Sequence, residues 1–236
     1  MKVLWIIPLT VDQALQFTSK NELARSFSGL GHEINTVVAY VRERTQMDGF
    51  SNVEYIYTPS GSVLKKIAFH FRMLRAVLAS DADVVMFGFQ AAHLIPLVRL
   101  ARPGKKTPKL VMDIRTIPVD VPPGLPGKIQ EWRYKASLKI ADLFCDGITV
   151  ITPMLASTVK PFLRKLQNRL GVWTSGVNLQ QFSRQGLDMR AALKLEGKTV
   201  LFYHGVLSPN RGLQNAIRAL DLLRNKIKNL IFLKLL

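Results

Sequence analysis

The sequence has a single cysteine, Cys145, so neither an intrachain disulfide nor a cysteine-rich metal site can form. This cysteine usage fits a reducing compartment, and we expect the protein in the cytoplasm. Long apolar runs are also absent: the longest uncharged stretch, 84–98, is shorter than the roughly 20 residues of a membrane-spanning helix. The opening MKVLWIIPLTV has no small-residue cleavage site after it, so we interpret it as a buried strand and not as a signal peptide. The sequence predicts a protein that does not cross a membrane.

Several catalytic motifs are missing as well. No GxGxxG follows the first apolar run and no GxxxxGK[ST] occurs, which argues against dinucleotide-binding and P-loop enzymes. The sequence has no GxSxG elbow, so a serine hydrolase is not expected. The four histidines show neither HExxH nor another metal-ligand spacing, and we expect no metal site.

Acidic residues are few: 16 Asp and Glu stand against 33 Lys and Arg, a net charge of +17. A field of that sign favours polyanions or anionic membrane surfaces as partners. One function that remains open is therefore a non-catalytic basic module that binds anionic membrane or nucleic acid. Nucleic acid is the less favoured partner, because only Phe69, Phe71, Trp132 and Tyr134 lie as aromatics among the basic segments.

Short runs rich in Val and Ile alternate with longer segments of helical period, the pattern of a parallel sheet covered on both faces. We predict an α/β fold, a doubly wound Rossmann-like domain. The predicted strands are 2–7, 33–40, 53–57, 83–88, 109–114, 147–151 and 170–173.

Two helices and one loop are marked clearly. Ser19 and Glu22 have the spacing of a capping box and Gly31 suits a left-handed C′ position, so we predict a helix over about 20–30. The loop at 118–127 is crowded with Pro and Gly and follows the fifth strand. It forms either a wall of a ligand site or a rigid connector.

The segment after Ser62 carries apolar residues at helical spacing, with Lys65, Lys66, Arg72 and Arg75 off that stripe. We interpret it as a helix that covers the sheet with a solvated basic outer face; membrane contact is the alternative. The predicted apolar stripe consists of Leu64, Ile67, Ala68, Phe71, Leu74 and Leu78.

A second domain begins near the end of the chain. TVLFYHG gives a new strand, followed by a glycine turn and a helix over about 212–225, and NLIFLKLL starts the next strand. We predict a Rossmann-like domain over 1–173, a linker over 174–198 and an incomplete second Rossmann-like domain over 199–236. The chain is expected to be a truncated form, because two strands cannot bury both faces of a sheet.

Three segments carry a family resemblance: LARSFSGLGHEINTVVAY, WTSGVNLQQF and VLFYHGVLSPNRGLQNAIRAL. In this order and spacing they resemble family 4 of the retaining GT-B glycosyltransferases. The resemblance implies hexosyl transfer from a nucleotide-diphosphate sugar, as co-substrate, to an acceptor, with the configuration retained and no metal or cofactor. It also implies that 1–173 is the acceptor-side domain and that 199–236 is the start of the donor-binding domain. The basic charge is compatible with a lipid-linked or polysaccharide-precursor acceptor and with peripheral contact at the inner face of an anionic membrane.

Cleavage of the donor leaves negative charge on a diphosphate, which cations and helix N-termini stabilise. Residues 205–213 supply Gly205 and Gly212 for close backbone approach and Arg211 as a forked donor. Arg211 stands where the family has Lys or Arg, whereas Val206 stands where many members have a second basic residue. We therefore predict that Gly205, Arg211 and Gly212 bind substrate.

In the first domain, Thr10 and Asp113 are the predicted substrate-binding residues and Arg115 the predicted catalytic residue. Arg115 follows the fifth strand and would bind an acceptor or phosphate anion; alternatively it forms a local pair with Asp113. The family's paired glutamates would fall beyond Leu236. We expect the 236-residue chain to transfer no sugar measurably.

Overall fold

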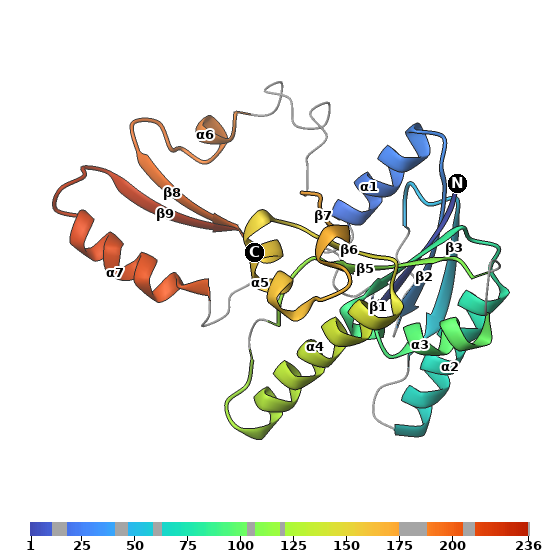
Figure 1. Ribbon diagram of the computed structural model, residues 1–236. Coiled ribbons are helices and arrows are strands. Elements are labelled where there is room, and N and C mark those ends of the chain that lie inside the picture. The colour runs from blue at the N-terminus through green and yellow to red at the C-terminus, as the bar shows by residue number, and fades with distance from the viewer. Residues whose placement is uncertain are drawn as a thin grey trace. The chain divides into compact units, whose positions relative to one another are not determined.

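A computed structural model describes residues 1–10, 18–40, 47–58, 63–102, 107–118, 121–174, 188–204 and 211–235. The chain divides into two compact units, each described here by itself (Figure 1). Unit 1 comprises Met1–Pro118 and Pro123–Asn178, and unit 2 comprises Val119–Pro122 and Leu179–Leu236.

Unit 1 is built on a seven-stranded parallel sheet in the order β3-β2-β1-β4-β5-β6-β7. The order reverses between β1 and β4, which confirms the predicted doubly wound α/β fold. β2 and β5 have the predicted bounds, and each of the other strands differs from its own predicted bounds by one to three residues at one end. The strands are β1 Lys2–Thr10, β2 Glu33–Tyr40, β3 Asn52–Tyr57, β4 Val84–Gly88, β5 Lys109–Ile114, β6 Gly147–Val150 and β7 Leu170–Val172.

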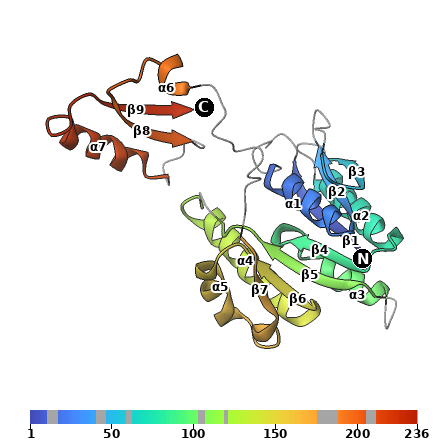
Figure 2. The same ribbon diagram turned by 90° about the horizontal axis from the view of Figure 1, so that it is seen from above.

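Helices cover both faces of this sheet, as Figures 1 and 2 show. Helix α1, Thr18–Gly29, packs on one face, where Ala24 is buried against Trp5 and Val38. Helices α2, Val63–Ala79; α3, Leu94–Ala101; α4, Leu125–Phe144; and α5, Pro153–Val159, pack on the other face. The described part of unit 1 also contains the 3-10 turns η2 Phe89–Ala91, η4 Lys160–Phe162 and η5 Gln167–Arg169.

The core of unit 1 consists of two apolar clusters, one on each face of the sheet. Central strand residues such as Ile6, Phe87 and Met112 are almost fully buried, because both faces of a parallel sheet are covered. Each such side chain contributes about 1.5–3 kcal/mol to folding. The continuous Val and Ile runs of the sequence thus reflect burial on two sides.

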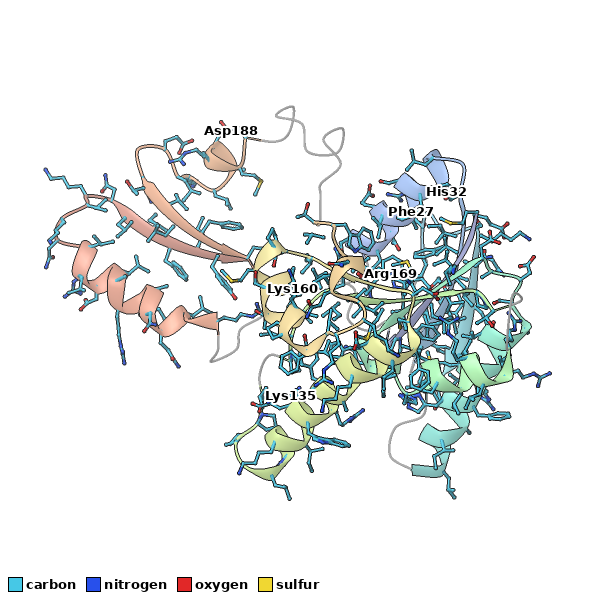
Figure 3. All side chains as sticks on the ribbon, viewed as in Figure 1. Phe27, His32, Lys135, Lys160, Arg169 and Asp188 are labelled. Atoms are coloured by element: carbon cyan, nitrogen blue, oxygen red, sulfur yellow. The ribbon has the colours of Figure 1, made fainter. Side chains whose placement is uncertain are left out.

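The end of α1 is a Schellman motif. Gly31, at φ +79°, donates its N–H to Ser28 O, and His32 donates to Phe27 O. The rings of Phe27 and His32 lie 6.0 Å apart and close the motif (Figure 3). The left-handed Gly31 is therefore confirmed, but the capping box is wrong: α1 already includes Thr18, so Ser19 lies inside the helix.

Helix α2 exists where predicted, but the buried face differs from the prediction. Phe69, Met73 and Val77, at i, i+4 and i+8, are buried against the sheet. The predicted stripe residues Leu64, Ile67 and Phe71 are exposed instead. The side chains of Val63, Lys65 and Lys66 lie outside the described part of α2. The helix carries apolar side chains around most of its circumference, so periodicity alone did not identify the inner arc.

The described part of unit 2 contains a two-stranded parallel sheet, β8 Thr199–His204 and β9 Leu230–Leu235, and helix α7, Leu213–Leu223. A short helix, α6 Met189–Ala192, lies in the segment predicted as a linker, and the Asp188 carboxylate accepts from the Arg190 and Ala191 N–H groups. Phe202 and Leu222 are more than half exposed. So small a sheet leaves apolar surface uncovered.

Candidate functional site

The candidate site of unit 1 lies at the carboxyl edge of its sheet, where doubly wound folds bind ligands. Thr10 is the last residue of β1, and its pairing with Ala39 follows a register shift after Ile7. Asp113 lies near the end of β5, and Arg115 follows that strand directly. The structure thus places all three predicted unit 1 site residues at strand ends; only the backbone of Thr10 is described.

Asp113 is a buried carboxylate with two hydrogen-bond donors. Its Oδ1 accepts from Thr149 Oγ1 at 2.8 Å and from Trp173 Nε1 at 3.0 Å, and only 3% of the residue is exposed. Burial raises the pKa of Asp113, while these hydrogen bonds and the charges of Arg115 and Lys20 act in the opposite direction. The carboxylate is thus oriented by β6 and by the residue after β7.

The side chain of Arg115 lies against Trp173. Its guanidinium carbon is 4.8 Å from the centre of the indole ring, and NH1 donates to Trp173 O at 3.3 Å. Stacking on an aromatic face holds the planar guanidinium in one orientation. Its charge opposes the rise in the pKa of Asp113 that burial causes, so the two side chains interact electrostatically.

Lys20, in the first turn of α1, is the third charged group of this cluster. Burial lowers the pKa of Lys20 to about 8; the charge of Asp113 opposes that shift and the charge of Arg115 adds to it. α1 packs on the face of the sheet that carries Trp5, Val111 and Trp173, and Lys20 interacts electrostatically with Asp113 near the end of β5. Two cations and one buried carboxylate therefore share the edge of the sheet.

The arrangement suits an anionic ligand. Arg115 offers a forked donor and Lys20 a second positive charge. Asp113 neutralises part of this positive charge. It also accepts a hydrogen bond from the Trp173 indole, on which Arg115 stacks. A phosphate or a carboxylate is the ligand that such donors bind best.

Sequence reasoning had identified Asp113 and Arg115 but not Lys20, Thr149 or Trp173. Trp173 opens the WTSGVNLQQF segment, so its place in that motif was the one available signal. Nothing in the sequence connects Lys20 with Asp113, because the helix start and the strand end meet only through the sheet order.

In unit 2, Arg211 and Gly212 precede α7. Gly212 has φ +69°, a left-handed conformation that favours glycine, and its carbonyl accepts from the N–H groups of Asn215 and Ala216. Arg211 is exposed. Gly205 lies outside the described residues. The predicted roles of these three residues in holding a diphosphate stay predictions.

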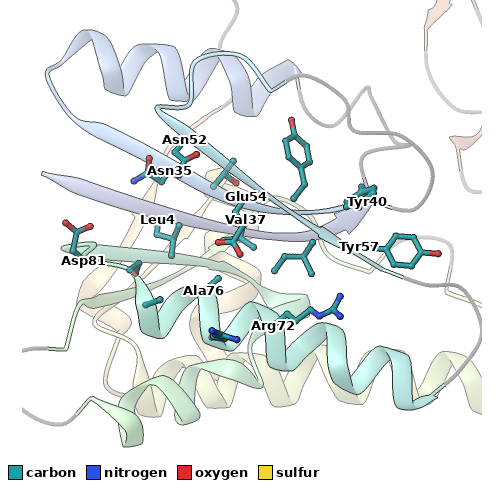
Figure 4. A pocket seen from close by; sticks show the side chains of 16 residues that line it. Leu4, Asn35, Val37, Tyr40, Asn52, Glu54, Tyr57, Arg72, Ala76 and Asp81 are labelled. Atoms are coloured by element: carbon teal, nitrogen blue, oxygen red, sulfur yellow. The ribbon is translucent and has the colours of Figure 1, made fainter.

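A cavity of about 700 Å³ lies elsewhere on unit 1, between β2, β3 and α2 (Figure 4). Its lining includes Tyr40, Glu54, Tyr57 and Arg72. None of the predicted site residues lines it, and its charges are mixed. We therefore place the candidate site at the carboxyl edge and not in this cavity.

Among the described residues, no group of three or more His, Cys, Asp or Glu side chains is arranged to hold a metal ion. Within the same part of the chain, no helix has the length and apolar character needed to cross a membrane.

The fold is similar to that of solved GT-B glycosyltransferases. A structure of Anabaena Alr3699/HepE with UDP and glucose aligns with a TM-score of 0.71 at 13% identity, over 99% of this chain and 60% of that one. Phytolacca americana apo UGT2 aligns with a TM-score of 0.57 at 12% identity, over 100% of this chain and 63% of that one. An α-glucosyltransferase bound to UDP and a mismatched 13-mer DNA aligns with a TM-score of 0.52 at 11% identity, over 98% of this chain and 55% of that one.

At the level of sequence, no protein-family model and no curated protein matches the chain. The chain spans about 60% of the length of the first two structures. At such low identity the likeness shows the fold alone, which is that of GT-B glycosyltransferases.

Proposed function

We propose that this chain belongs to a glycosyltransferase that moves a sugar from a nucleotide-diphosphate donor to an acceptor. The observation that carries the proposal is the cationic cluster of Lys20 and Arg115 around Asp113, at the carboxyl edge of a GT-B sheet. The solved structures of similar fold are glycosyltransferases, and the Anabaena protein was crystallised with UDP and glucose. A site of this chemistry suits a phosphate-bearing substrate.

The finer assignment rests on the sequence motifs. We propose membership of family 4, retention of the anomeric configuration and a reaction without metal. In this proposal Arg211 and the turn before α7 hold the departing diphosphate, and the unit 1 cluster holds the acceptor or a phosphate of the substrate. The proposed acceptor is a lipid-linked sugar or a polysaccharide precursor, used at the cytoplasmic face of a membrane.

Binding of nucleotide sugars to the purified chain is the readout that tests this proposal. Saturation-transfer NMR on the purified chain, with UDP-, GDP- and ADP-sugars, detects weak complexes of about millimolar affinity, which corresponds to about 4 kcal/mol. We expect signals from at least one nucleotide sugar. Their absence for every nucleotide sugar and sugar phosphate would refute the proposal.

A matched pair of variants localises the binding. Arg115→Ala should weaken it about tenfold to a hundredfold, because a hydrogen bond to a charged group contributes about 1.5–3 kcal/mol. Arg169→Ala removes the same charge from an exposed residue before β7, at the opposite edge of the sheet, and should leave binding unchanged. Equal losses in both variants would indicate a nonspecific effect of net charge.

A further inference from the structure

The outer surfaces of three helices on one face of the unit 1 sheet are unusually apolar. Helix α4 exposes Leu125, Ile129 and Trp132, which are 70%, 49% and 69% exposed. These residues stand at i, i+4 and i+7, so they share one arc of the helix. The opposite arc, with Tyr134, Leu138 and Ala141, is buried in the core. Helix α4 therefore has an apolar inner stripe and an apolar outer stripe.

Helix α2 repeats this arrangement. Leu64, Ile67 and Phe71 are 77%, 60% and 67% exposed and again share one arc, at i, i+3 and i+7. The short helix α3 packs against both α2 and α4, and it exposes Leu97 and Leu100. Figures 1 and 2 show the three helices on the same side of the sheet. We call their outward side chains the α2–α4 outer surface.

Basic side chains flank the apolar stripes. On α4, Lys128, Lys135 and Lys139 lie at i, i+7 and i+11 beside the outer stripe; Lys135 is labelled in Figure 3. Arg72 and Arg75 are exposed on α2.

Acidic residues are nearly absent from the same surface. The sequences of α2 and α3 contain none. Helix α4 has two acidic residues, of which Glu131 is exposed. Asp142 is buried, and its Oδ1 accepts from the Lys165 and Leu166 N–H groups. The α2–α4 outer surface is thus apolar and positively charged at once.

We propose that the α2–α4 outer surface docks on an anionic lipid bilayer. Interfacial helices combine a Leu, Ile, Phe or Trp stripe with Lys and Arg at its margins, and this surface has that composition on two helices. The lysines and arginines match the negative lipid headgroups, and the stripe residues enter the boundary with the acyl chains. A nucleic acid would satisfy the charges but would leave Leu and Ile side chains without a partner.

The proposal rests on the proposed function only in its link to a membrane-bound acceptor; the contact itself does not require sugar transfer. Helix α4 follows the loop that leaves β5, whose end carries Asp113. The N-termini of helices that return antiparallel to a parallel sheet lie at the carboxyl edge of its strands. Docking would therefore hold the candidate site close to the lipid headgroups.

The test is co-sedimentation of the full chain with vesicles of phosphatidylcholine alone or mixed equally with phosphatidylglycerol. We expect binding to the anionic vesicles, weakened by salt, and little binding to the neutral ones. Ile129→Ser/Trp132→Ser should lower the partition coefficient at least tenfold without loss of folding, since both side chains are exposed. Leu30→Ser/Met154→Ser is the matched control, because these residues are as exposed but lie outside α2, α3 and α4.

A charge pair and a spectroscopic readout complete the design. Lys135→Glu/Lys139→Glu should lower binding to anionic vesicles about tenfold or more, whereas Lys160→Glu/Arg169→Glu should change it less than threefold. Trp5 is buried and Trp173 is partly buried, whereas Trp132 is 69% exposed. Vesicles should therefore shift Trp fluorescence to the blue in the native chain, and most of this shift should be lost in Trp132→Phe.

Three results would overturn the docking proposal. The first is the absence of binding to anionic vesicles, and the second is an equal loss of vesicle binding in Ile129→Ser/Trp132→Ser and in its control. The third is that Ile129→Ser/Trp132→Ser abolishes self-association or RNA binding and leaves vesicle binding unchanged. The stripe lies on the face of the sheet opposite α1, so its variant should keep the nucleotide-sugar NMR signal that Arg115→Ala loses. Failure of docking and failure of the proposed function are thereby separable.

Discussion

Replacing Asp113 perturbs the centre of the candidate site. Its carboxylate accepts hydrogen bonds from Thr149 Oγ1 and Trp173 Nε1, and it is coupled to Arg115 and Lys20. Asp113→Ala leaves two partly buried donors without their acceptor. Each unsatisfied donor costs about 1–3 kcal/mol, while removal of a buried charge returns part of that. We expect the free energy of unfolding to fall by about 2–4 kcal/mol.

Asp113→Asn separates the hydrogen bonds from the charge. The amide oxygen still accepts a hydrogen bond, so this variant should lose about 1 kcal/mol or less at neutral pH. Burial raises the pKa of Asp113 in the folded protein above its ordinary value of 3.8. The folded state therefore binds the proton more readily than the unfolded state. The native chain should gain stability over Asp113→Asn as the pH falls through the folded-state pKa toward 3.8.

Urea unfolding followed by Trp fluorescence measures these differences, in a pH series from 7 to about 4. Asp142→Ala is the matched control, because this buried carboxylate also loses two hydrogen bonds, from the Lys165 and Leu166 N–H groups, but lies away from the site. It should destabilise the protein without changing nucleotide-sugar binding. A loss below about 0.5 kcal/mol in Asp113→Ala, or a pH trend of opposite sign, would refute the reasoning.

Three other perturbations have defined outcomes. Gly31→Ala should lower the free energy of unfolding by about 1 kcal/mol in urea titrations, because Gly31 has φ +79°, whereas Gly29→Ala, at a helical residue with equally open space, should raise it slightly. Burial lowers the pKa of His70 and His93, so their contribution to the free energy of unfolding should be fully present above pH 6.5 and should decrease as the pH falls below that value. In thermal melts, His93→Gln should make the melting temperature less dependent on pH. An unchanged pH profile would exclude His93 as the source of this dependence. Lys20→Met should increase the urea midpoint of unfolding at pH 7, because burial lowers the pKa of Lys20 to about 8 and its charge is costly to bury. The same variant should weaken nucleotide-sugar binding. A higher urea midpoint together with stronger nucleotide-sugar binding would argue against Lys20 as a ligand group.

The candidate site was only half visible in the sequence. Asp113 and Arg115 follow a recognisable buried strand, and strand ends of a parallel sheet are where ligands bind, so both could be proposed in advance. Lys20 gave no such signal, because its role depends on α1 packing over the end of β5. Trp173 stood in a recognised motif, but its contacts with Asp113 and Arg115 follow from the pairing of β7 beside β6.

The sequence by itself determined the sheet and its connections, since runs of Val and Ile buried on both sides leave a pattern that few other folds produce. It also determined local stops such as Gly31, where a left-handed backbone requires glycine. Tertiary structure alone decided which arc of α2 and α4 is buried. Both helices are apolar on two sides, so either arc fits the helical periodicity of the sequence. On α2, packing against the sheet buries Phe69, Met73 and Val77 and leaves Leu64, Ile67 and Phe71 exposed.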